Sequence, residues 1–207
     1  ELLKSGDSLR AGMQIADSIN AAKAKLIYLV FEEFEKQLAG VAERNHWTRE
    51  KKSNWYEYKE QADEFFYKWN TTYPGINYIV NDAPMPDGKQ LWFRVEVEHR
   101  LFAGFCVFDP NAESEEGHGD QVDEYDAATV KAVGHYLKIS AADHKDWWAT
   151  WWYLPAGEQK PNDSVPNFKI MNDAAIALAD KECRSEFVSL CVRNIEEMVE
   201  RVLAIPE

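Results

Sequence analysis

The feature that most constrains this chain is a pair of apolar runs, residues 91–98 and 101–108, separated only by His99 and Arg100. Parallel strands need a crossover connection of a dozen or more residues, whereas a two-residue link can join antiparallel strands. The two runs therefore predict a β-hairpin inside an antiparallel sheet. His-Arg lacks the glycine or asparagine that tight hairpin turns favour, so the pairing register rests on the apolar pattern.

The register of this hairpin decides which side chains face the core, because successive side chains of a strand point to opposite faces. A tight turn pairs Glu98 with Leu101 and leaves one face wholly apolar, which we expect to rest on helices. The apolar face is predicted to hold Leu91, Phe93, Val95, Val97, Phe102, Gly104, Cys106 and Phe108. The opposite face is predicted to hold Trp92, Arg94, Glu96, Glu98, Leu101, Ala103, Phe105 and Val107.

Glu96 and Glu98 raise the question of chemistry, because paired carboxylates can hold a metal ion. Pro-Asp at 86–87, followed by these two glutamates, partly matches the PD-(D/E)XK nuclease pattern, in which carboxylates hold the ion and a lysine activates water. The lysine position is Glu98 here. We therefore predict no catalytic residue and no metal ligand, and we expect both glutamates on a solvent-facing or salt-bridged surface near Arg94.

Apolar residues recurring at threes and fours predict long helices on both sides of the hairpin. The expected helices cover residues 8–44, 53–70, 122–138 and 172–203. Further strands are expected at residues 76–80, 146–156 and 168–170. The predicted fold class is α+β, with an antiparallel sheet of about four to five strands packed against long helices.

The same pattern suggests how the 207 residues are organised. Residues 1–72 are predicted to form an N-terminal helical hairpin, and residues 73–207 an α+β sheet region with a C-terminal helix. A chain of this length suits one compact domain that contains both parts. It begins with Glu1 instead of methionine, which we interpret as a hint that it belongs to a larger protein.

Charge narrows the classes of partner. The net charge of −13 argues against direct nucleic-acid binding, which needs clustered lysine and arginine. Residues 109–126 carry eight acidic side chains and no lysine or arginine, which is typical of a mobile acidic loop, and they lack the ligand spacing of a calcium loop. The basic residues between 44 and 52 are interpreted as a solvated helix junction in preference to a phosphate site.

The remaining composition bears on location and cofactors. Cys106, Cys183 and Cys191 form no CxxC motif, so a reducing compartment is the simplest interpretation and we expect a cytoplasmic protein. The sequence contains no run of eighteen apolar residues that could cross a membrane. No cofactor is expected, and Mg²⁺ only if a nuclease domain precedes this chain.

Tryptophan is the most unusual part of the composition, with eight residues of which four lie between 147 and 152. In a regular strand, one side of this segment can join the core, while the other needs a cover or a ligand. The cover could be the first helix or a partner subunit; the ligand alternative is an aromatic groove for a peptide, base or sugar. The candidate ligand-binding residues are Trp92, Arg94, Glu96, Glu98, Phe105, Trp148 and Trp152.

Four segments occur in a recognisable order. Tyr73-Pro-Gly-Ile is followed by LWFRVEVEH at 91–99, FAGF at 102–105 and Trp152-Tyr-Leu-Pro. This order resembles the C-terminal, non-catalytic region of bacterial PD-(D/E)XK nuclease superfamily proteins common in gut Bacteroidetes. The resemblance implies an accessory domain for target recognition, regulation or assembly, in a protein that could defend against foreign DNA. It carries over no catalytic residue, so whether the parent protein is an enzyme stays open.

Two other classes of function compete with this accessory role. A free-standing acidic interaction protein, such as an inhibitor that mimics nucleic-acid charge, would use the −13 net charge. A small-molecule sensor would use the aromatic groove. The expected partner is a protein or an upstream nuclease domain, with self-association as a further option.

Overall fold

Six antiparallel strands and two long helices dominate the computed structural model, which describes residues 6–51, 57–67, 73–113, 119–139, 147–156 and 164–203. The helices are α1 (Gly6–Arg44), α2 (Tyr58–Gln61), α3 (Ala127–Leu137), α4 (Asp173–Ala177) and α5 (Lys181–Leu203). The strands are β1 (Trp47–Glu50), β2 (Gly75–Val80), β3 (Gln90–Val97), β4 (Leu101–Asp109), β5 (Asp120–Gln121) and β6 (Thr150–Leu154). Two short 3-10 turns complete the list: η1 (Glu64–Phe66) and η2 (Pro86–Gly88).

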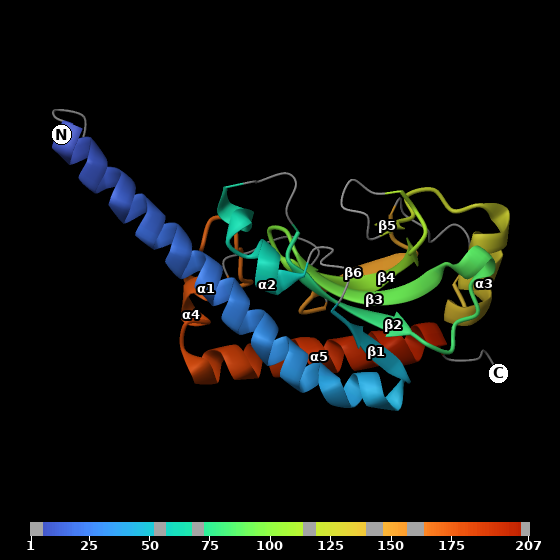
Figure 1. The fold of residues 1–207 in the computed structure, drawn as a ribbon. Helices are drawn as coiled ribbons and strands as arrows, with labels where there is room; N and C mark the ends of the chain where they lie inside the picture. Colours follow the sequence, from blue (N-terminus) through green and yellow to red (C-terminus); the bar gives the residue numbers. More distant parts are fainter. Residues whose placement is uncertain are drawn as a thin grey trace.

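The strands form one sheet in the order β1-β2-β3-β4-β5, with β6 pairing β4 next to β5 (Figure 1). Every pair of neighbouring strands is antiparallel. The α+β fold class is therefore confirmed. The sheet contains two short strands that were not predicted, because β1 and β5 have only four and two residues and carry little apolar pattern.

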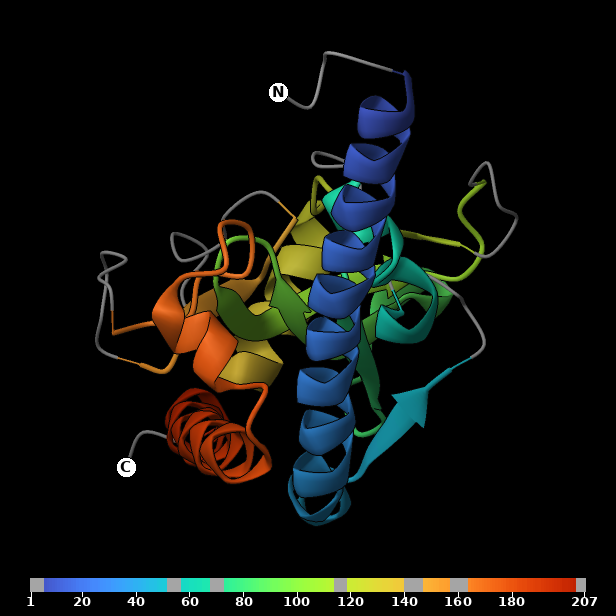
Figure 2. The ribbon, with the colours of Figure 1, turned by 90° about the vertical axis from the view of Figure 1, so that its left-hand side faces the viewer.

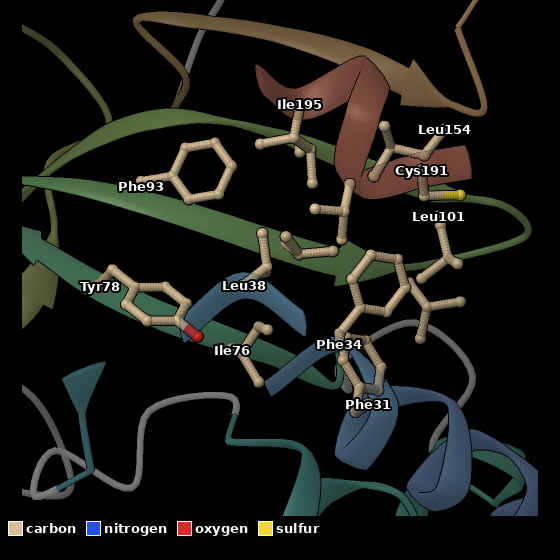
Figure 3. Packing of buried hydrophobic residues seen from close by; sticks show 14 of the residues in the cluster. Phe31, Phe34, Leu38, Ile76, Tyr78, Phe93, Leu101, Leu154, Cys191 and Ile195 are labelled. Carbon is tan, nitrogen blue, oxygen red and sulfur yellow. The ribbon is translucent and has the colours of Figure 1, made fainter. Parts of the chain in front are cut away.

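One face of this sheet rests on α1 and α5, which pack against each other beneath it (Figures 1 and 2). Side chains of both helices point to the sheet and are fully or almost fully buried, each contributing roughly 1.5–3 kcal/mol (Figure 3). The labelled core residues are Phe31, Phe34, Leu38, Ile76, Tyr78, Phe93, Leu101, Leu154, Cys191 and Ile195. Because α1 shares this core with β2, β3 and β4, the N-terminal helix belongs to the same packing unit as the sheet.

The predicted register of the central hairpin is wrong by one residue. Val97 pairs with Leu101, and the connection is a three-residue turn over 98–100. A shift of one residue exchanges the two faces of a strand. Phe102, Gly104, Cys106 and Phe108 therefore face away from the helices, and the core instead receives Leu101, Ala103, Phe105 and Val107. The longer turn suits His99-Arg100, which lacks the residues of a tight turn.

The predicted second helix over 53–70 is mostly wrong within the part of it that the structure describes. Only α2 and η1 are helical there, separated by Ala62 and Asp63, while residues 53–56 and 68–70 lie outside the described residues. The aromatic face that suggested a helix is nevertheless buried, because Tyr58 and Phe65 pack into the core. In the described part of residues 1–72, α1 is therefore followed by β1, which pairs with β2, and not by a second long helix.

Local side-chain hydrogen bonds explain two further differences between the predicted and observed elements. The predicted last helix is interrupted before α5, where Asp180 Oδ1 accepts hydrogen bonds from the backbone of Glu182 (2.8 Å) and Cys183 (3.0 Å) as an N-terminal cap. The predicted strand at 168–170 is a turn, because Asn167 Oδ1 accepts hydrogen bonds from the backbone amides of Lys169 and Ile170.

The acidic segment 109–126 is described on both sides of residues 114–118, which lie outside the described residues. β5 pairs with the end of β4, and Asp126 caps α3 by accepting a hydrogen bond from the Thr129 amide at 2.7 Å. Lys89 Nζ lies 2.9 Å from the Asp126 carboxylate. The described parts of this segment are therefore held by specific contacts.

Two glycines should respond to substitution in opposite directions. A Cβ at Gly104 would lie 2.7 Å from Cβ of Trp151 and would also meet the Thr150 carbonyl, so Gly104→Ala should lower the free energy of unfolding by about 1–3 kcal/mol. Gly40 lies inside α1 and meets only the flexible end of Arg44, so Gly40→Ala should raise it by up to about 1 kcal/mol. Urea unfolding followed by tryptophan fluorescence measures both; equal effects would contradict this packing.

Candidate functional site

The face of the sheet opposite α1 and α5, here called the outer face, gathers most of the candidate residues. The strand pairing places Asn77, Ile79, Trp92, Arg94, Glu96, Phe102, Cys106, Phe108, Trp151 and Tyr153 on it. The arrangement follows from alternation along each strand once the register is known. Two features stand out on this face: a buried ion pair and a group of aromatic rings.

The ion pair joins Arg94 and Glu96, which point to the same side of β3 because they are two residues apart. Arg94 is fully buried, and its Nε lies 2.5 Å from Oε2 of Glu96. The rest of the guanidinium donates to the side-chain oxygen of Asn77 and, at 2.8 Å, to the carbonyl of Tyr73. Arg94 is thus held by three acceptors, as a buried charge requires.

Gly75 explains how the guanidinium fits against β2. A Cβ at this position would lie 2.9 Å from Nη2 of Arg94 and 2.6 Å from the carbonyl of Val95. Only glycine leaves room for the arginine to reach the Tyr73 carbonyl. The glycine of the Pro-Gly sequence at 74–75 therefore makes space for the buried pair.

The structure separates the roles of the two glutamates. Burial raises the pKa of Glu96, and the charge and hydrogen bond of Arg94 offset part of this rise. Of the two alternatives predicted for Glu96, solvent-facing or salt-bridged near Arg94, the structure shows the salt-bridged one, with Glu96 buried. Glu98 lies in the exposed turn, with Oε1 at 3.5 Å from Nε2 of His99. The two carboxylates therefore do not form a shared site.

The aromatic rings of the outer face form two groups. Trp92 stacks on Phe108 with ring centres 3.9 Å apart, and both are buried. A second group, here called the outer aromatic row, stays partly accessible and consists of Phe102, Trp148, Trp151 and Tyr153.

Edge contacts hold the outer aromatic row together. Phe102 lies edge-on to Trp148 at 5.4 Å and to Trp151 at 5.8 Å, and Trp151 lies edge-on to Tyr153 at 5.0 Å. The guanidinium of Arg100 lies 4.5 Å from the Tyr153 ring centre. At least one ring of the row thus already receives a cation on its face.

The groove predicted from four aromatic residues is not assembled. Phe105 and Trp152 face the helices and belong to the hydrophobic core, whereas Trp92 and Trp148 pack together on the outer face. Two causes act together. The hairpin register moves Phe105 to the core, and the alternation expected between Trp148 and Trp152 is interrupted near Ala149.

The interruption is a local one. Thr150 is the register partner of Phe105, yet the amide of Ala149 also donates to the Phe105 carbonyl, at 2.8 Å. Two successive residues therefore face one residue of β4, as in a β-bulge, and the side chains before this point change faces. No sequence signal marks a bulge in a segment with so many large side chains.

A second polar network lies on the helix side, between α1, β1 and α2, and was missed from the sequence. Arg49 donates to both carboxylate oxygens of Glu57 at 2.8 Å, and its Nε lies 3.4 Å from Glu35. Glu35 also accepts a hydrogen bond from the Tyr58 hydroxyl at 2.9 Å and an ion pair from Lys51 at 2.8 Å. The predicted basic junction is therefore neutralised by carboxylates, which disfavours a phosphate site there.

Burial and charge act in opposite directions on this network. Burial alone would raise the pKa of Glu35, but the hydrogen bonds from Lys51 and Tyr58 and the charge of Arg49 outweigh it and hold this pKa at about 2. Burial raises the pKa of Glu57, and Arg49 offsets part of the rise. The network is best explained as a support that fixes β1 and α2 to α1.

Clusters of metal-binding side chains and membrane-spanning helices are both absent from the described residues. Within them, no three histidine, cysteine, aspartate or glutamate side chains gather closely enough to hold a metal ion. Nor does any helix among the described ranges have the length and apolar character needed to span a bilayer.

Comparison of the chain with protein-family models, with curated proteins and with solved structures returns no match. The resemblance to the C-terminal region of PD-(D/E)XK proteins therefore stays a prediction, and function must be argued from the outer face itself.

Breaking the buried ion pair should cost much more than replacing it. Arg94→Met leaves the Glu96 carboxylate buried without its cation and should lower the free energy of unfolding by about 3–5 kcal/mol. The double variant Arg94→Met/Glu96→Leu removes both charges and should lose clearly less than the two single variants together. Urea unfolding of the four proteins forms the cycle, and additive losses would show that the two side chains do not interact.

The network of Glu35, Arg49, Glu57, Tyr58 and Lys51 should make the melting temperature depend on pH. The folded pKa of Glu35 lies below its ordinary value of 4.5, so its stabilising effect is complete above that pH and disappears as the pH falls towards 2. Glu35→Gln should therefore lower the melting temperature at neutral pH, and the difference from the natural protein should shrink between pH 4.5 and 2. Glu32→Gln, at an exposed position of the same helix, is the control and should show no such convergence.

Proposed function

We propose that this chain is a non-catalytic recognition domain of a PD-(D/E)XK nuclease-like protein, and that its outer aromatic row binds a positively charged segment of a partner protein. The observation that carries the proposal is the row itself: Phe102, Trp148, Trp151 and Tyr153 remain partly accessible on the sheet face opposite α1 and α5. Partly exposed aromatic rings in one group are a common mark of a binding surface.

The charge of the surroundings favours a cationic ligand. Glu98 lies at the turn end of β3 and β4, and Asp109 pairs with Asp120 at the opposite end of β4. Acidic side chains thus flank the row in both directions along β4, within a chain of net charge −13. Such a field attracts lysine and arginine and repels phosphate, and indole and phenol rings add cation–π attraction. The contact of Arg100 with Tyr153 is an internal example of it.

The same geometry argues against a catalytic role for the hairpin. Glu96 forms an ion pair with Arg94, and Glu98 lies in the exposed turn between β3 and β4. The two carboxylates that suggested a nuclease therefore do not point to a common site. This supports the accessory role that the resemblance implies, with recognition of a protein segment as the specific task.

Binding can be tested by titrating the chain with a synthetic peptide rich in arginine and lysine and following tryptophan fluorescence. We expect affinity that weakens as salt is added. Trp151→Leu and Tyr153→Leu keep an apolar side chain but remove the ring, so each should raise Kd roughly fivefold, equivalent to about 1 kcal/mol. Ile176→Ala, at an exposed site on α4, should leave Kd unchanged.

Three controls decide the outcome. A glutamate-rich peptide and a single-stranded oligonucleotide should not bind, and duplex DNA with Mg²⁺ should stay uncut. Equal binding of acidic and basic peptides, or ring variants with unchanged Kd, would overturn the recognition proposal. Mg²⁺-dependent cleavage that is lost in Glu98→Gln would overturn the non-catalytic role.

A further inference from the structure

The first half of α1 carries an apolar surface that the rest of the described chain does not cover. From Gly6 to Ala22, here called the arm, no side chain is buried, and burial begins at Ala24. Four large hydrophobic residues of the arm are strongly exposed: Leu9 (46%), Met13 (61%), Ile15 (59%) and Ile19 (49%). Figures 1 and 2 show this part of the helix extending beyond the sheet and the other helices.

The exposed hydrophobic residues of the arm form two pairs, Leu9 with Met13 and Ile15 with Ile19, each one turn apart along the helix. At 3.6 residues per turn, Leu9, Met13 and Ala16 continue the stripe that packs into the core further along α1. Ile19 and then Ile15 border this stripe along one edge, and Asp17 and Arg10 border it along the other edge. The charged residues of the arm are Asp7, Arg10 and Asp17. The arm is thus built like a helix that packs against something.

An apolar helix surface of this kind is unfavourable in water when nothing packs against it. The arm is about 25 Å long at 1.5 Å per residue, and a helical segment of this length is marginal in water unless its apolar side is packed. Four exposed apolar side chains within eleven positions also form a contiguous patch, which monomers seldom leave open. A partner helix of the same apolar and nearly neutral character would satisfy both conditions.

Charge points to a second copy of this chain as the occupant. The whole chain carries −13, so two copies repel each other over most of their surfaces. The arm holds two acids and one base, and it extends away from the acidic body. It is the surface by which two copies can meet while their bodies stay apart.

The sequence of charges further favours an antiparallel meeting. With the two-fold axis beside Gln14 and Ile15, Met13 lies across from the partner's Ala16, and Arg10 comes within reach of the partner's Asp17. A parallel pair would instead set like charges beside each other and bring the two acidic bodies together. We propose that the arm is a self-association surface that pairs two copies of this chain as antiparallel helices.

The oligomeric state of the full chain tests this directly. Sedimentation equilibrium should find the unsubstituted 207-residue chain at twice 23.9 kDa, about 47.8 kDa, and Met13→Glu as a monomer. No arm residue is buried, so Met13→Glu should keep its circular dichroism spectrum and melting of the body. Ile176→Glu places the same charge on an equally exposed isoleucine of α4 and should remain dimeric. An unsubstituted chain that stays monomeric up to roughly 100 μM, or a dimer that tolerates Met13→Glu, would overturn the proposal.

A charge exchange tests the orientation. Asp17→Arg should weaken dimerisation by about threefold or more, because it sets two arginines near each other. Arg10→Asp combined with Asp17→Arg restores opposite charges across an antiparallel pair and should recover the natural dimerisation constant. Failure of this recovery in a chain that still dimerises through Met13 would reject the antiparallel register.

Discussion

The pairing of Val97 with Leu101 is the constraint on which the rest of this fold depends. Because side chains alternate across a strand, this pair and its three-residue turn decide which side of β4 meets α1 and α5. The orientation of β4 also fixes the orientation of β6, because paired residues of neighbouring strands face the same side. Trp152, opposite Ala103, therefore enters the core, while Trp151, opposite Gly104, stays on the outer face. Interior and surface of half the sheet are thus set by one turn.

Sequence reasoning predicted well the elements whose apolar period is long. The 39-residue α1 and the central hairpin both repeat one pattern over many residues, and both are confirmed. Elements held by contacts between separate segments were missed: β1 pairs with β2 and is tied to Glu57 by the ion pair of Arg49, and the helix break before α5 carries the cap by Asp180. Such contacts join residues far apart in the chain, or choose between two conformations of similar local propensity, so periodicity cannot reveal them.

The candidate site shows the same division. Proximity of Arg94 and Glu96 could be predicted, because residues two apart in a strand share a face. Their burial could not, because it depends on Asn77, on the Tyr73 carbonyl and on the space left by Gly75. The positions of Phe105 and Trp152 were mispredicted, because a one-residue error in register or a bulge moves a side chain to the opposite face of the sheet. Predictions of which residues lie close together were therefore more accurate than predictions of which face of the sheet they lie on.

The continuity of α1 has a mechanical consequence. The arm and the core stripe belong to one uninterrupted helix, which then reverses direction through Asn45 and His46 into the edge strand β1. A continuous helix resists bending, because a sharp kink requires broken backbone hydrogen bonds. Whatever holds the arm is consequently set at a fixed distance and angle from the sheet, and a force on the arm reaches the sheet edge without an intervening hinge.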